Sequence, residues 1–282
     1  MRRFFFIALL MFSIMPQNAK AVESAWSSAS EVQARILSGV ETIGAQNEFD
    51  AALELRLSPG WHTYWRSPGE AGLAPRFNWE GSENLSEALV KYPLPSRIDE
   101  AGFVTFGYDG DIILPLKIKP EEPNKAMKIN LGLDVMVCKE ICIPEHLELE
   151  LDIDAGQGKN SGHMAVIKRA NSKVPMHMSG QGLEIGNITV TQDTIVATIE
   201  SKRGFDQSEI FFEINEIALP GKVERQIDPA DEKKAIYKIA IPQDVQEHQQ
   251  FIGRSSLPFA GAAITITFSD GQNAVEGTLI IH

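Results

Sequence analysis

The sequence has few cysteines, no excess of positive charge and, after its first residues, no long apolar run. Only two cysteines occur in 282 residues, Cys138 and Cys142, so a fold held by several disulfides is excluded. Acidic residues outnumber basic ones by 38 to 26, and the net charge of −12 argues against nucleic acid and anionic lipid as partners. No Ser-His-Asp arrangement, phosphate-binding glycine loop or HExxH helix is evident, and we expect no cofactor and no metal.

The one sustained apolar segment lies at the start of the chain. Arg2 and Arg3 precede the apolar run from Phe4 to Met15, which is too short to span a bilayer comfortably, and Ala19-Lys20-Ala21 is a small-x-small cleavage site. This pattern predicts a cleaved signal peptide over residues 1–21 and no membrane insertion of the mature chain. Because no multi-disulfide pattern follows, we favour a bacterial periplasm, where thiols can be oxidised.

Period-two alternation of apolar and polar residues predicts an all-β protein. It is clearest over 53–57, 129–137 and 147–153, where one face of each strand would point into a sandwich. The pairs Pro59-Gly60, Asp109-Gly110 and Asp270-Gly271 predict turns between strands.

The mature chain of about 260 residues is long enough for two domains. A polar, glycine-rich stretch begins after Ala155, and residues 163–173 have the composition of a short helix that ends before Pro175. Strand patterns then return at 185–190, 195–199, 210–214, 235–241, 263–268 and 275–281. We therefore predict two immunoglobulin-like β-sandwich domains, 22–155 and 181–282, joined by a linker over 156–180 with a short helix.

The two cysteines are placed to face each other across a hairpin. Cys138 ends one strand-like run and Cys142 begins the next, so the loop would be Lys139-Glu140-Ile141. Opposite residues of such a pair have Cβ atoms about 4.5–5.5 Å apart, and a disulfide needs roughly 3.5–4.5 Å. A disulfide is therefore feasible.

The chemistry of the pair leaves three alternatives open: thiol–disulfide exchange, a structural or incidental disulfide, and metal binding. Exchange is favoured, since so short a ring gives little entropic stabilisation and a chain of this size has ample core. Two thiolates alone make a poor zinc site. His146 and the segment Met176-His177-Met178 offer further ligands for a soft ion such as Cu(I), although a solvated histidine and a simple linker segment explain them as well.

Three segments between Trp26 and Asp154 resemble the N-terminal periplasmic domain of the DsbD family, and more closely that of its ScsB branch. In order, these are Gly60-Trp61-His62-Thr63-Tyr64-Trp65-Arg66, which resembles the family's aromatic strand; Tyr92-Pro93, Asp99-Glu100, Tyr108 and Leu114-Pro115-Leu116, which resemble the cap-loop region; and Cys138 to Pro144, which resembles the redox hairpin.

The resemblance implies an immunoglobulin-like sandwich with Cys138 and Cys142 as the redox pair. In the family, this domain takes electrons from a membrane-embedded reductase through a thioredoxin-like domain and passes them to oxidised periplasmic thiol proteins. The chemistry is thiolate attack on a disulfide through a mixed disulfide. It also implies that Asp99 and Glu100 lie in the cap loop and assist proton transfer.

The aromatic residues near the hairpin complete the expected site. By the same resemblance, Tyr64 and Trp65 pack near the disulfide, although aromatic residues on strands are more often core than binding face. The cap aromatics of DsbD are replaced by Ala101 and Gly102 in this chain, so we expect Phe103, or else Phe106, to shield the disulfide.

Two features depart from DsbD itself. The cysteines are closer together than in DsbD, and nothing after the first domain resembles a membrane channel or a thioredoxin-like domain, so we expect a separate protein to supply electrons. The alternative function is a non-catalytic periplasmic binding or adaptor protein with a structural disulfide and a link to copper tolerance. Arg66 offers a contact for an anionic group, but we interpret it as one half of an ion pair that supports the fold.

Overall fold

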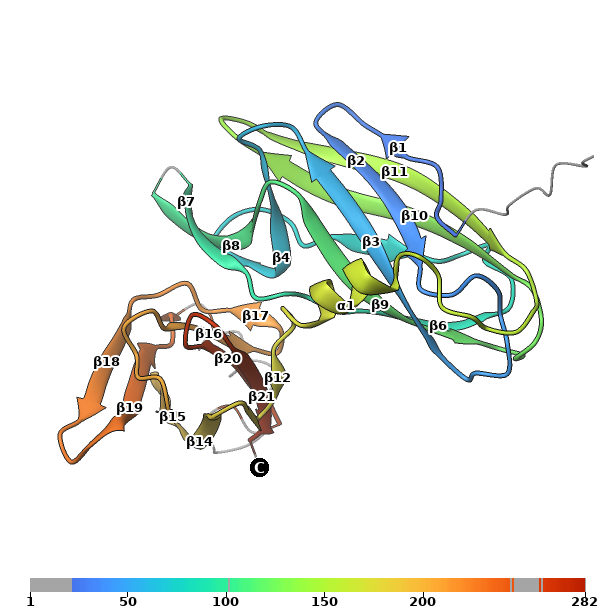
Figure 1. Cartoon of the computed structure of the whole chain (residues 1–282). Helices are drawn as coiled ribbons and strands as arrows, with labels where there is room; N and C mark the ends of the chain where they lie inside the picture. The colour runs from blue at the N-terminus through green and yellow to red at the C-terminus, as the bar shows by residue number, and fades with distance from the viewer. Residues whose placement is uncertain (1–21, 101, 244, 246–258, 260, 282) are drawn as a thin grey trace, which may run out of the picture.

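Two β-sandwiches lie next to each other, with a short helix close to where they meet (Figure 1). The structure is a computed structural model that describes residues 22–100, 102–243, 245, 259 and 261–281. The predicted signal peptide, residues 1–21, lies outside the described residues and stays a prediction.

The first sandwich is built from two antiparallel sheets, in which neighbouring strands are often not consecutive along the chain. One sheet has the order β1 (Ser27–Ser28), β2 (Val32–Ser38), β3 (Phe49–Leu57), β9 (Ile112–Pro120) and β6 (Leu85–Val90). The other has the order β11 (Cys142–Ile153), β10 (Met127–Cys138), β4 (His62–Gly69), β8 (Phe103–Asp109) and β7 (Ser96–Glu100), and β5 (Arg76–Asn78) also pairs with β10. Strand β4, next to the long β10–β11 hairpin, becomes central to the site.

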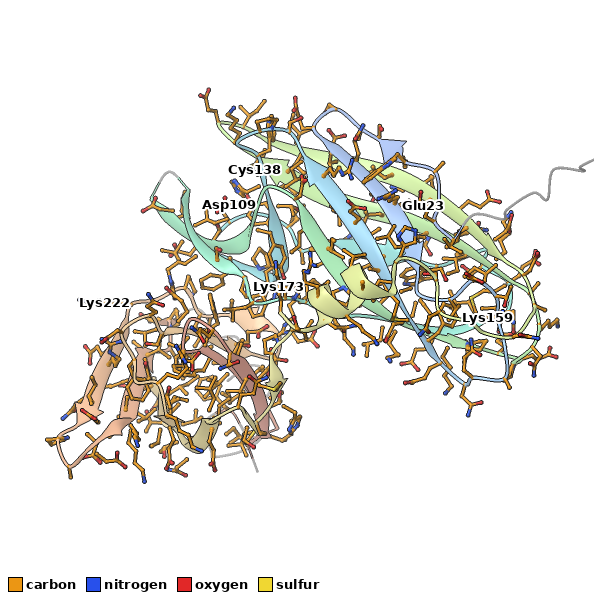
Figure 2. The ribbon with its side chains drawn as sticks, in the orientation of Figure 1. Glu23, Asp109, Cys138, Lys159, Lys173 and Lys222 are labelled. Atoms are coloured by element: carbon orange, nitrogen blue, oxygen red, sulfur yellow. A yellow bond between two sulfur atoms is a disulfide. The ribbon has the colours of Figure 1, made fainter. Side chains whose placement is uncertain are left out.

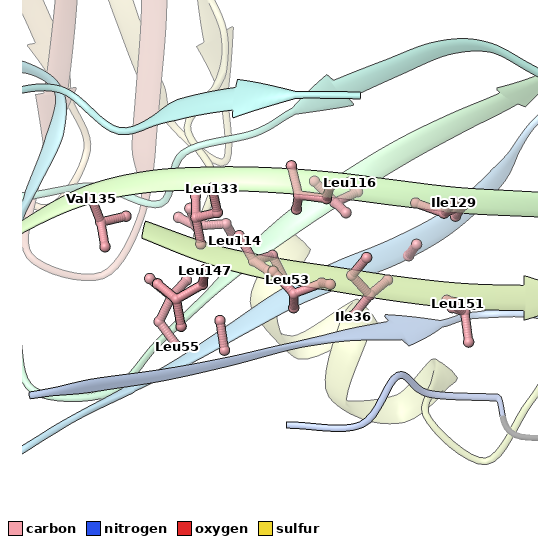
Figure 3. Packing of buried hydrophobic residues seen from close by; sticks show 14 of the residues in the cluster. Ile36, Leu53, Leu55, Leu114, Leu116, Ile129, Leu133, Val135, Leu147 and Leu151 are labelled. Carbon is pink, nitrogen blue, oxygen red and sulfur yellow. The ribbon is translucent and has the colours of Figure 1, made fainter. Parts of the chain in front are cut away.

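The core of the first sandwich follows the predicted alternation. The alternating apolar residues of 53–57, 129–137 and 147–153 are buried, and those of 129–137 and 147–153 pack against Leu53, Leu55, Ile36, Leu114 and Leu116 of the facing sheet (Figure 3). Each fully buried Leu or Ile contributes about 1.5–3 kcal/mol relative to exposure. Because a slip of one residue would turn this whole set to solvent, the register of the hairpin that carries the cysteines is strongly fixed.

The second sandwich has its own buried cluster and two five-stranded sheets. One has the order β12 (Met176–His177), β21 (Ala274–Ile280), β20 (Ala263–Ser269), β16 (Glu209–Ile214) and β17 (Ile217–Ala218). The other has the order β13 (Ser179–Gly180), β14 (Leu183–Val190), β15 (Thr194–Ser201), β19 (Asp231–Ala240) and β18 (Val223–Asp228).

The segment between the sandwiches contains the helix α1 (Met164–Asn171), within the range in which a helix was predicted. Its buried Ile167 packs on Leu37 and Ala52 of the first sandwich. The short strands β12 and β13 also fall within the range predicted as linker, and both pair with strands of the second sandwich. The all-β class with two sandwiches is confirmed. Across the described residues, no helix has the length and apolar character needed to cross a membrane.

Candidate redox site

The two cysteines close the end of the β10–β11 hairpin. Every residue of β10 from Met127 onward has a partner on β11, and the last pair is Cys138 opposite Cys142. The amide of Lys139 donates to the carbonyl of Ile141 at 3.1 Å, which forms the predicted three-residue loop. The Cα atoms of the cysteines are 4.1 Å apart and their sulfur atoms are bonded. The predicted hairpin and disulfide are both present.

The two sulfur-bearing residues differ sharply in exposure. Cys138 is only 1% exposed, whereas Cys142 is exposed, and Ile141 beside it has 65% of its surface in solvent. Cys138 lies opposite His62 of β4, which in turn lies opposite Asp109 of β8, so β10 is an inner strand at this end of the sheet. Figure 2 labels Cys138 and Asp109 at this end of the first sandwich. The exposure of the two residues therefore favours Cys142 over Cys138 as the one that a thiolate from solvent approaches.

A buried phenol contacts the disulfide. The hydroxyl of Tyr64, on β4, lies 2.9 Å from Sγ of Cys138 and 3.6 Å from Sγ of Cys142. A disulfide sulfur carries no hydrogen, so the phenol is the donor in this pair. Tyr64 is 1% exposed, and the hydroxyl of Thr63 beside it donates to the carbonyl of Met136 on β10 at 2.9 Å. The strand thus holds a hydrogen-bond donor against the buried sulfur.

A glycine that the sequence analysis did not single out keeps Tyr64 in place. Gly72 has φ +85°, and a Cβ atom there would lie 2.2 Å from the ring of Tyr64. Both the conformation and the contact therefore require glycine. The sequence signal was weak, since Gly72 is one of 22 glycines and lies outside the recognised segments.

The other aromatic residues expected near the site differ in burial and in their contacts. Trp65 is fully buried and packs against Phe106 and Phe211, with ring centroids 6.4 and 5.7 Å away. Phe106 is likewise fully buried, while Phe103 is 54% exposed. Of the pair, Phe103 thus has the exposure that a shielding role requires, and that role stays a prediction.

The acidic pair of the cap loop lies at the end of the β7–β8 hairpin. Asp99 is exposed, and its carboxylate accepts a hydrogen bond from the amide of Gly102 at 3.1 Å. Glu100 pairs with Phe103 through the backbone ladder. Among the described contacts, no hydrogen bond or ring contact joins Asp99 or Phe103 to the buried sulfur, so their part in proton transfer or shielding stays a prediction.

His146 is held by carboxylates on both ring nitrogens. Nδ1 lies 2.6 Å from Asp134 and Nε2 lies 2.6 Å from Glu148, and these two hydrogen bonds raise the pKa of His146 above its ordinary value. An imidazole engaged in this way is protonated more readily and has no free lone pair for a metal. Within the described ranges, no group of three His, Cys, Asp or Glu residues has the geometry of a metal site.

A shallow groove of about 260 Å³ runs beside the hairpin. Its walls come from Leu73 and Arg76 on one side and from Met136, Pro144 and His146 on the other. Leu73 is 55% exposed. The groove reaches Pro144, two residues after Cys142, and Ile141 is exposed at the tip of the hairpin.

The fold and the hairpin together define a β-sandwich that carries a dithiol–disulfide pair, a class typical of thiol–disulfide interchange. Residues 33–153 match the family described as Thiol:disulfide interchange protein DsbD, N-terminal. The resemblance found in the sequence is thereby confirmed, and the first sandwich is a domain of the DsbD N-terminal type.

The chain is similar in fold to solved structures, one of which matches it over nearly its whole length. The crystal structure of the N-terminal periplasmic domain of ScsB from Proteus mirabilis matches over 92% of this chain and 98% of that chain, with a TM-score of 0.68 and 22% sequence identity. At this identity the likeness shows the fold, and it extends over both sandwiches. No curated protein matches the chain in sequence.

Proposed function

We propose that this protein is a periplasmic thiol–disulfide exchange module that relays electrons through Cys138 and Cys142 between a thiol reductase and periplasmic thiol proteins. The observation that carries the proposal is the asymmetry of the pair: Cys142 is an exposed residue, and Cys138 is buried with its sulfur against the hydroxyl of Tyr64. A structural disulfide does not need a hydrogen-bond donor aimed at one of its sulfurs. A thiolate leaving group does, because such a donor stabilises the charged form.

The proposed reaction begins at the exposed sulfur. A thiolate of the reductase attacks Sγ of Cys142, the Cys138–Cys142 bond breaks, and its electron pair leaves on Sγ of Cys138, which accepts a hydrogen bond from Tyr64. The second thiolate of the reductase then attacks its own sulfur in the mixed disulfide and releases the thiolate of Cys142. Reduction of a partner disulfide runs through the same steps in reverse, with Cys142 as nucleophile and Cys138 as the resolving thiol.

The proposed partners follow from the family and from the surface of the chain. A thioredoxin-like or membrane-embedded thiol reductase supplies electrons, and oxidised periplasmic thiol proteins accept them. The export signal expected over residues 1–21 supports this compartment, since protein disulfides form and persist in oxidising compartments such as the periplasm. The groove beside the hairpin supports the approach of folded partners.

Trapping of mixed disulfides tests the proposal. In a Cys138→Ser variant the exposed Cys142 keeps its thiol but has no resolving partner, so a mixed disulfide with an oxidised thioredoxin-like protein should accumulate. In the matched Cys142→Ser variant the remaining thiol is buried, and little adduct should form. Equal trapping by both variants would contradict the assigned roles.

The reduction potential of the wild-type pair separates exchange from a static bond. We expect a value between those of thioredoxin, about −270 mV, and DsbA, about −120 mV. A value below about −300 mV, together with full biological activity of a double Cys138→Ser/Cys142→Ser variant, would instead support the adaptor alternative.

A further inference from the structure

The backbone pairing of strand β4 with its neighbours is interrupted after Tyr64. Its described partners are Thr63 opposite Val137 on β10, and Tyr64 opposite Gly107 on β8, and pairing with β8 resumes only at Gly69. The intervening segment, residues 65–68, therefore takes no support from the described ladder on either side. This segment directly follows the residue that contacts the sulfur of Cys138.

The second sandwich holds that segment instead. The hydroxyl of Ser67 donates to the carbonyl of Glu216 at 2.7 Å and accepts from the amide of Ala218 at 2.6 Å. The ring of Trp65 packs against Phe211, which is itself 1% exposed. Trp65 and Ser67, together with Arg66 between them, thus contact the second sandwich, and Tyr64 directly before them contacts the disulfide.

Arg66 makes the strongest of these contacts. Its Nε lies 3.1 Å from Oε1 of Glu213 and its Nη2 lies 2.6 Å from Oε2, so the ion pair with Glu213 is bidentate. Nη2 also lies 2.5 Å from the carboxylate of Glu276. The hydroxyl of Thr267 donates to Glu276 at 2.7 Å, so that carboxylate is itself fixed. The guanidinium lies 4.3 Å over the ring of Trp65. Pairing of this fork type restricts orientation as well as distance.

The charges of this cluster depend on one another. Glu213 is 1% exposed, and burial raises its pKa, while the hydrogen bond and charge of Arg66 oppose that rise. Burial alone would lower the pKa of Arg66, but Glu213 first and Glu276 second raise it overall. A buried carboxylate of this kind is tolerated only with its cation present. Arg66 is therefore held at one position relative to β16 and β21.

We propose that Arg66 is a positioning residue for thiol exchange: its ion pair with Glu213 clamps β4 to the second sandwich and thereby holds the hydroxyl of Tyr64 at the sulfur of Cys138. The inference rests on the proposed function, in which Cys138 leaves as a thiolate. It assigns to the second sandwich a part in the chemistry of a disulfide that it does not touch in any described contact. The hydrogen bond is sensitive to small shifts, because its strength falls quickly with distance and angle.

A double-mutant cycle on the rate of exchange with a reduced thioredoxin-like donor tests the inference. Glu213→Gln removes the charge but keeps the shape, and it leaves Arg66 paired with Glu276. We expect this change to slow exchange about threefold or more in the wild-type background, and to have no further effect in a Tyr64→Phe background. Arg66→Lys keeps the positive charge but loses the fork, and it should slow exchange in the same way.

Glu54→Gln is the matched control. Glu54 forms a comparable, largely buried ion pair with Arg35 in the first sandwich, at 2.7 Å, away from β4. This variant should be destabilised to a similar degree and keep the wild-type exchange rate. Near-ultraviolet circular dichroism shows that each variant is folded, and Arg66→Lys serves if Glu213→Gln does not fold.

Three outcomes are distinguishable. If wild-type protein does not exchange with the donor at all, the proposed function fails. If wild-type protein exchanges and Tyr64→Phe slows it, but Glu213→Gln leaves the rate unchanged, only the positioning role of Arg66 is overturned. If Glu213→Gln slows exchange by the same factor with and without the hydroxyl of Tyr64, the proposed coupling of Arg66 to the disulfide through Tyr64 is overturned.

Discussion

Replacing Tyr64 by phenylalanine removes one hydroxyl from the redox site and leaves the ring that packs there. The hydroxyl lies 2.9 Å from Sγ of Cys138, and Tyr64 is 1% exposed, so water cannot easily take its place. A hydrogen bond to a charged group is worth about 1.5–3 kcal/mol, and 1.36 kcal/mol corresponds to one pKa unit. We therefore expect the pKa of the Cys138 thiol in the reduced protein to rise by about 1–2 units.

The rate of exchange should fall in the same variant. A lower thiol pKa makes a better leaving group, and for attacking thiols about half of a pKa change appears in the logarithm of the rate. With a similar sensitivity for the leaving thiolate, reduction of the disulfide by a dithiol donor should slow about three- to tenfold.

Titration of the thiolate by its ultraviolet absorbance measures the pKa directly. The Cys142→Ser variant leaves Cys138 as the only thiol, and the titration is then repeated with Tyr64→Phe added. Tyr108→Phe is the control, because Tyr108 is also buried in this sheet and donates to the carbonyl of Pro93 at 2.8 Å, away from the disulfide. An unchanged pKa of Cys138 in a folded Tyr64→Phe variant would refute the role given to the phenol.

Two further predictions concern the surroundings of the hairpin. Gly72→Ala should lower the free energy of unfolding by about 2–4 kcal/mol in denaturant titrations, because the new Cβ meets the ring of Tyr64 and the backbone has φ +85°. Gly102→Ala, with φ +90° and open space around it, should show only the smaller backbone effect, and equal losses would argue against the contact with Tyr64. The imidazole of His146 should titrate above 6.5 by NMR, and Asp134→Asn should move its pKa down, since Asp134 is the larger cause of the shift. Because the folded-state pKa of His146 lies above the unfolded value, the protonated imidazole stabilises the fold below pH 6.5, and this contribution is lost as the pH rises through the folded-state pKa. The side chain is exposed, so the effect on stability should be small. A pKa of His146 that does not move in Asp134→Asn would contradict the assignment.

The hairpin was predictable because two independent sequence signals agree on it. Period-two alternation marks 129–137 and 147–153 as strands with one buried face, and the three residues between the cysteines have the length of a hairpin loop, so Cys138 falls opposite Cys142. The burial of Cys138 and the exposure of Cys142 were not predictable, because they depend on β4 covering one cysteine and not the other. The interpretation of Arg66 as half of an ion pair is confirmed, but its partner is 147 residues away, a separation that no local pattern reveals.

The sequence nevertheless contains a signal for the ion pair of Glu213. It is the only charged residue within the run Ile210-Phe211-Phe212-Glu213-Ile214, a strand whose residues are buried on both faces. A single carboxylate in such a run requires a cationic partner, and Arg66 was available. Strand β18 (Val223–Asp228) was missed for the opposite reason: it lies at a sheet edge and is mostly exposed, so it lacks apolar alternation. The domain limits and the periplasmic location stay predictions.

The aromatic packing between the sandwiches limits how the chain can be divided for study. Trp65 and Phe106 owe part of their cover to Phe211, which comes from the other half of the protein. A fragment that ends after β11 would uncover these rings and leave Arg66 without its carboxylates, and apolar patches newly opened to water promote aggregation. The role of the disulfide is therefore best studied by point substitutions in the intact polypeptide. In an isolated first sandwich, aggregation and a displaced β4 would affect the measured thiol chemistry.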